Sequence, residues 1–132
     1  MAAVPDRMQR LGLPPELLAT HHIRFLPEAD RSVISSISYG VLFVMAFWSG
    51  PARKAFVELK RVLAATDPDG HLELVVVDTD GCADLYEVPG FAGKLHGAGE
   101  TAWVRNGKIL FTSGLRFRPE CFEPNTRGLL KA

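Results

Sequence analysis

The sequence has little cysteine, and its cysteines are far apart. There are only two among 132 residues, Cys82 and Cys121. This number and spacing indicate neither a disulfide framework nor a zinc knuckle. The adjacent histidines His21 and His22 cannot both point at one metal ion from a regular helix or strand. We therefore expect reduced thiols and no bound metal.

The sequence also lacks a dominant charge and a long apolar run. Fifteen basic residues balance fifteen acidic ones, so no overall field draws the chain to nucleic acid or to an anionic membrane. The longest apolar run, Val41 to Trp48, is far shorter than the ~20 residues of a membrane-spanning helix. The segment Met1–Arg10 lacks the apolar core of a secretory signal. These absences predict a cytoplasmic protein with no nucleic-acid or membrane partner.

The composition is that of an ordinary globular domain. Hydrophobic residues make up 47% of the chain and charged residues 23%, without the low hydrophobicity that marks disorder. A chain of this length fits one domain. Near the N-terminus the apolar pattern is interrupted at Gly12 and Pro14, which favours short helices. We interpret residues 1–22 as an N-terminal helical extension and residues 23–132 as the main domain.

The apolar pattern of the main domain predicts alternating strands and helices. Ile23–Leu26 is strand-like, and the residues from Glu28 to Ile37 have helical spacing. The continuous run Val41–Phe47 is typical of a central strand covered on both faces. The β-branched run Leu72–Val77 predicts a second central strand. Between the two central strands, Ala52 to Ala65 has the spacing of an amphipathic helix, so the expected topology is a right-handed parallel βαβ unit. The charged residues between its apolar positions are Arg53, Lys54, Glu58, Lys60 and Arg61.

Turn residues separate these elements. Asp67–Gly70 has the composition of a turn, and Asp78–Gly81 is interpreted as a strand-to-helix turn. Asn106-Gly107 between two strand-like runs, Thr101–Val104 and Lys108–Thr112, predicts a β-hairpin. A further weak signal is a helical turn or two within Ala83–Val88.

One segment resembles a known active-site motif. Phe47-Trp-Ser-Gly-Pro-Ala-Arg-Lys54 is similar to the Trp-Cys-Gly-Pro-Cys-Lys motif of thioredoxin, and it likewise lies between an apolar strand and a long helix. Val77–Asp80 resembles the end of that family's next strand, and Trp103–Lys108 resembles its final hairpin. The resemblance, from about Ile23 to Leu115, implies an α/β thioredoxin-like three-layer fold. Its mixed central sheet would contain a parallel βαβ unit and a C-terminal β-hairpin, flanked by helices. The resemblance also implies a helix that closes the sheet, and Pro124 and Gly128 would disturb that helix.

The resemblance also implies that the redox chemistry is lost. The nucleophilic cysteine of the family falls on Ser49 and the resolving cysteine on Ala52, whereas disulfide exchange needs two thiols. The buried proton-relay acid falls on Phe43, the lysine near it on Val76, and the cis-proline on Gly99. We therefore expect no catalytic residues, no cofactor and no dithiol–disulfide exchange.

Two residues of the motif have both a structural and a functional interpretation. Ser49 has the features of a helix N-cap, with Pro51 in the first turn, whereas a serine nucleophile would need a positioned base that is not readable here. Trp48 either covers the helix start or forms an exposed aromatic anchor for a partner.

These observations lead to two hypotheses about function. The first is a redox-inactive domain that binds a protein or peptide, as an adaptor, assembly factor or chaperone-like module. The second is a single-thiol redox enzyme or sensor that uses Cys82, although Cys82 also fits a small buried hydrophobe beside several acidic residues. The residues expected at the binding surface are Trp48, Ser49, Gly50, Pro51, Ala52, Ala98, Gly99 and Glu100.

Overall fold

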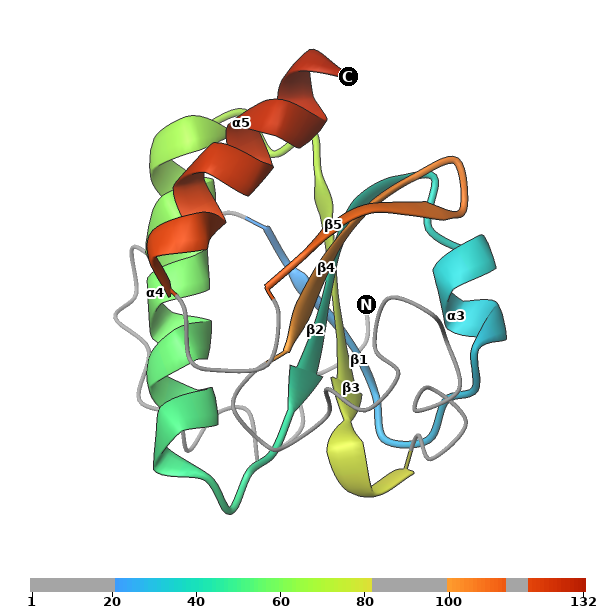
Figure 1. The fold of residues 1–132 in the computed structure, drawn as a ribbon. Coiled ribbons are helices and arrows are strands. Elements are labelled where there is room, and N and C mark those ends of the chain that lie inside the picture. The colour runs from blue at the N-terminus through green and yellow to red at the C-terminus, as the bar shows by residue number, and fades with distance from the viewer. Residues whose placement is uncertain (1–20, 82–99, 114–118) are drawn as a thin grey trace.

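A five-stranded mixed sheet lies at the centre of the molecule (Figure 1). The computed structural model describes residues 21–81, 100–113 and 119–132. Within them the strand order is β1-β3-β2-β4-β5, so the strands that are buried on both faces stand in the middle of the sheet. The strands are β1 (Ile23–Leu26), β2 (Tyr39–Met45), β3 (Glu73–Asp78), β4 (Thr101–Arg105) and β5 (Lys108–Thr112).

The predicted parallel βαβ unit is confirmed. Strand β2 leads into helix α4 (Gly50–Thr66), which returns the chain to β3, parallel to β2. The register sets Phe43 beside Val76 and Met45 beside Asp78. Strand β2 ends two residues earlier than the apolar run suggested, because the chain already turns at Ala46.

The helices form two layers, one on each face of the sheet (Figure 1). Helices α4 and α5 (Phe122–Lys131) cover one face, and the short helix α3 (Ser32–Ser35) lies over the other. On the α4 side the core is built around Phe43, Phe56 and Trp103. The indole N–H of Trp103 donates to Thr126 Oγ1 at 3.0 Å, which fixes α5 against β4. The described part of the chain is thus the predicted three-layer arrangement.

The predicted hairpin is also confirmed. Asn106 and Gly107 have φ values of 52° and 74° between β4 and β5, the left-handed conformations that a two-residue type I′ turn requires. Asn106 N–H donates to the carbonyl of Ser38 at 2.7 Å. The hairpin is therefore attached to the loop that enters β2.

The helix expected over residues 28–37 is wrong in extent, because only Ser32–Ser35 is α-helical. The residues before it are held by the chain that follows β3. Ala29 N–H donates to the carbonyl of Gly81 at 2.9 Å, and a Cβ atom on Gly81 would lie 2.0 Å from the carbonyl oxygen of Pro27. This close backbone contact fixes the segment in a non-helical path.

The final helix, in contrast, is more regular than expected. Helix α5 continues through both Pro124 and Gly128. Pro124 is the third helical residue, and the N–H groups of the first turn have no intrahelical partner to lose. Gly128 makes room for the ring of Phe111, whose nearest atoms would lie 3.0 Å from a Cβ. Both residues are therefore compatible with the helix.

Gly40 allows β2 and β3 to approach each other, and we predict that Gly40→Ala destabilises the fold. A Cβ on Gly40 would lie 2.5 Å from the carbonyl oxygen of Glu73, so the backbones must move apart. We expect the free energy of unfolding to fall by about 1–3 kcal/mol, as for other overpacked cores. Urea denaturation measures this change. Gly50→Ala is the matched control, because its Cβ would meet nothing within 4 Å, and an equal loss in both variants would contradict the steric explanation.

Candidate functional site

The motif region is a tight turn at the carboxyl end of β2. Ser49 N–H donates to the carbonyl of Ala46 at 3.0 Å, which closes the turn over residues 46–49. Within this turn the two aromatic side chains diverge. Phe47 is partly buried and meets the ring of Phe25 edge-on at 5.7 Å, whereas Trp48 is 65% exposed. The turn therefore presents a large apolar side chain to solvent.

The cap interpretation of Ser49 is confirmed. Ser49 has an extended backbone, and its Oγ accepts a hydrogen bond from Ala52 N–H at 3.3 Å. Pro51 lies in the first turn of α4, where a missing N–H costs nothing. The side chain of Ser49 is thus committed to the start of the helix, and the residue is only 7% exposed.

The layer beneath the motif is apolar. Phe43 and Val76 are register partners on adjacent strands, and both are fully buried. The ring of Phe43 meets that of Phe56 from α4 edge-on at 5.2 Å. Neither side chain of this pair can accept or release a proton, so the expectation that an apolar pair replaces a proton relay agrees with the packing.

The other residues expected at the binding surface divide into exposed, buried and undescribed groups. Pro51 is exposed and Gly50 is partly exposed, with open space above Gly50. Ala52 is fully buried. Glu100 is 2% exposed, and its carbonyl accepts from Val44 N–H at 2.8 Å, so it does not belong to the exposed surface. Three of the predicted site residues lie outside the described residues, namely Cys82, Ala98 and Gly99.

Comparison with solved structures identifies this architecture. Mitochondrial thioredoxin 3 from Saccharomyces cerevisiae superposes with a TM-score of 0.60 and 17% identity, covering 86% of this chain and 98% of that one. Thioredoxin from Trypanosoma brucei brucei superposes with a TM-score of 0.57 and 17% identity, covering 83% and 96%. The chain has a thioredoxin-like fold.

Further comparisons limit what this likeness means. A chain from a structure on the thiol-resolving mechanism of a yeast mitochondrial 1-Cys peroxiredoxin also superposes, with a TM-score of 0.60 and 18% identity over 81% of this chain and 95% of that one. No protein-family model matches the sequence, and no curated protein matches it either. At these identities the likeness establishes the thioredoxin-like fold, and the function must be argued from the site.

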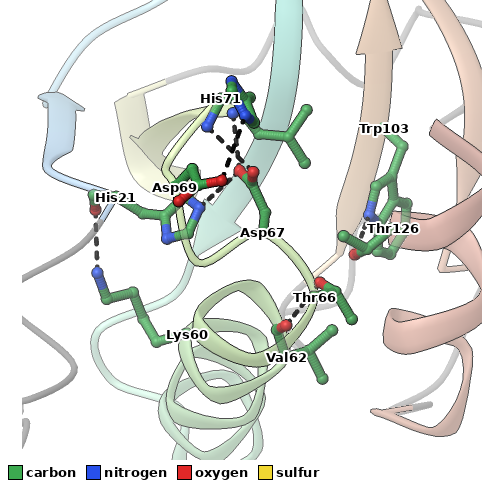
Figure 2. Close-up of polar contacts among 10 residues, drawn as sticks. His21, Lys60, Val62, Thr66, Asp67, Asp69, His71, Trp103 and Thr126 are labelled. Carbon is green, nitrogen blue, oxygen red and sulfur yellow. Dashed lines mark hydrogen bonds and ion pairs between the residues drawn. The ribbon is translucent and has the colours of Figure 1, made fainter. Parts of the chain in front are cut away.

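A buried polar cluster, which the sequence pattern did not predict, lies at the opposite end of α4 (Figure 2). His21 Nε2 lies 2.8 Å from Asp67 Oδ2, and both side chains are almost completely buried. Lys60, predicted on the charged face of the helix, is instead 1% exposed, and its Nζ donates to the carbonyl of His21 at 2.9 Å. The cluster therefore ties the entry of β1 to the end of α4.

Asp67 organises this cluster. Burial raises the pKa of its carboxyl group, but hydrogen bonds from Leu72 N–H, from His21 and from His71 N–H outweigh that effect and lower the pKa below its usual 3.8. The predicted turn at Asp67–Gly70 therefore has a wider function than expected, because one carboxylate holds both the turn and the buried histidine.

Two other expectations concern thiols and metals. Cys121 is partly buried against the core beside α5, in a position that fits packing. Among the described residues no three His, Cys, Asp or Glu side chains are grouped closely enough to hold a metal ion. No helix in that part of the chain is long and apolar enough to cross a membrane.

We predict that Ser49→Cys combined with Ala52→Cys forms an internal disulfide that cycles poorly. The two positions are joined by the cap hydrogen bond within one turn, so the sulfur atoms can meet. Phe43 and Val76 occupy the positions of the family's relay acid and lysine, and neither side chain can manage the proton on the resolving thiol. Peptide mapping by mass spectrometry locates the bridge, and insulin turbidity with dithiothreitol measures turnover, for which the wild-type chain should match buffer. Only intermolecular dimers, or rapid turnover, would contradict the proposed geometry.

We predict that burial of Lys60 makes the folded state more stable as the pH rises into the alkaline range. Burial lowers the pKa of Lys60 from 10.5 to about 8, so between these values the unfolded chain binds more protons than the folded one. The free energy of unfolding should therefore rise as pH increases from about 8 towards 10.5. Lys60→Met should flatten this slope, whereas Lys54→Met, at an exposed position of the same helix, should preserve it. Denaturant titrations across this pH range test the difference, and an unchanged slope in Lys60→Met would refute it.

Proposed function

We propose that this thioredoxin-like domain is redox-inactive and acts by binding a protein or peptide at the turn around Trp48. The observation that carries the proposal is that Trp48 is 65% exposed although Ser49 and Ala52 occupy the positions of the reactive cysteines. An exposed tryptophan does not gain the free energy of removing its apolar surface from water, and tryptophan is enriched among the anchors of protein interfaces.

The immediate surroundings of Trp48 support a shallow binding surface. Pro51 is exposed, and the open space above Gly50 leaves the backbone of the turn accessible. Ser49 and the first turn of α4 hold this backbone in one conformation through the cap hydrogen bond. A rigid turn with an exposed aromatic side chain can bind a partner without a large loss of conformational entropy.

The geometry does not favour covalent chemistry at the same position. The Ser49 hydroxyl accepts the cap hydrogen bond from Ala52 N–H, and no His lies among the motif residues 46–54. A serine nucleophile needs a general base within hydrogen-bonding distance. We therefore propose a non-enzymatic role, exercised through contact with a partner.

The test is whether Trp48→Ala weakens binding more than it weakens the fold. A buried aromatic anchor can contribute ~2 kcal/mol or more, so partner affinity should fall by roughly thirtyfold. The free energy of unfolding should change by less than ~0.5 kcal/mol, as for most surface substitutions. Affinity capture from the native host with both proteins, quantified by mass spectrometry, measures the first effect, and thermal melts measure the second.

Leu110→Ala is the matched control. Leu110 is another large apolar side chain, 41% exposed on the edge strand β5, so it tests for non-specific loss of surface hydrophobicity. Recovery of the partner should survive this change. Equal recovery by wild-type and Trp48→Ala protein, with unchanged melts, would show that the turn is not the binding surface.

A further inference from the structure

The exposed turn has a cationic flank on the side of α4. Arg53 and Lys54 are both exposed, and they follow Trp48 within about one and a half helical turns. The first turn of α4 contains no acidic residue, so no carboxylate there neutralises these side chains. The helix has 17 residues, and its N-terminus adds a partial positive charge of the same sign.

On the opposite flank of the turn the exposed charge is negative. Because β2 and β3 are parallel, the chain after β3 reaches the same edge of the sheet as the turn (Figure 1). There Asp80 is exposed in the short 3-10 helix Thr79–Gly81, while Asp78 and Glu100 are buried. Within the described residues of these two segments the exposed charges are therefore separated, with Arg53 and Lys54 on α4 and Asp80 beyond β3.

This arrangement limits the chemistry of a partner. A basic segment would be repelled on the α4 side, and an uncharged segment would gain no attraction from the two cations. Trp48 and Pro51 provide an apolar contact between the flanks. Extended polyanions are a poor match for this surface. Only two exposed cations lie on the α4 flank among the described residues, and the chain as a whole carries a formal net charge of +0.

We propose that the turn selects a peptide segment in which an aromatic or long aliphatic residue is followed or preceded by acidic residues. The apolar residue packs on Trp48, and the carboxylates lie against Arg53 and Lys54 on α4. This inference rests on the proposed binding function. It adds the chemical class of the partner and the side of the turn on which the acidic residues of the partner lie.

The first experiment selects ligands without assuming a partner. A random peptide library displayed on phage is panned on the immobilised full chain, with counter-selection on Trp48→Ala. Enriched peptides should contain an aromatic or aliphatic residue beside Asp or Glu, with acidic residues more frequent than Lys or Arg. One enriched peptide is then synthesised, and its affinity is measured by fluorescence anisotropy.

The second experiment locates the carboxylates. The double variant Arg53→Glu with Lys54→Glu should bind this peptide about tenfold more weakly, since both attractions become repulsions. Lys108→Glu with Lys131→Glu changes the net charge equally at exposed positions outside α4 and the turn and should bind like the wild type. The difference in peptide affinity between the two double variants should shrink as the salt concentration rises from about 0.01 M to about 1 M, because the screening length falls from ~30 Å to ~3 Å.

The outcomes separate the two proposals. Neutral or basic peptides that still require Trp48 would overturn the acidic class and leave the binding function intact. No enrichment over Trp48→Ala would overturn the binding function itself. An equal loss of affinity in both double variants would show that overall charge, and not the α4 flank, attracts the peptide.

Discussion

The parallel contact between β2 and β3 is the constraint on which the other elements depend. From Gly40 to Met45 and from Leu74 to Asp78 every residue of the two strands is buried, so helices must cover both faces. Helix α4 can run back along the sheet to the start of β3 only if the chain reverses direction soon after Met45. The turn over residues 46–49 makes this reversal, and it leaves Trp48 in solvent because Phe47 already occupies the inward position.

The elements that the sequence predicted well are those with local signals. Asn106-Gly107 specifies its own turn through backbone conformation, and the apolar spacing of α4 specifies which face is buried. The motif likewise located the cap at Ser49, because a serine before Pro at a helix start needs only local geometry. None of these inferences required knowledge of what lies opposite in space.

The remaining features depend on contacts between distant parts of the chain. Lys60 has the sequence context of a solvent-facing residue, but its ammonium group meets a carbonyl 39 residues earlier. Gly128 could be understood only from the ring of Phe111 that packs on it. Glu100 is buried, and its backbone carbonyl pairs with Val44 of β2, 56 residues earlier in the chain. For the candidate site, the motif therefore located the helix start at Ser49, and only the tertiary structure showed which residues of the turn reach solvent.

The positions of the charges separate stability from recognition. The cluster of His21, Asp67 and Lys60 lies at the far end of α4 from the turn (Figures 1 and 2), and each member is buried, so its contacts act on the folding equilibrium. Beneath the turn, Phe43 and Val76 form an apolar layer that holds no proton. The nearest exposed charges on α4 are those of Arg53 and Lys54. Binding at the turn should consequently respond to salt, whereas the alkaline response of stability belongs to Lys60. The two ends of one helix thus carry electrostatic effects that can be measured independently.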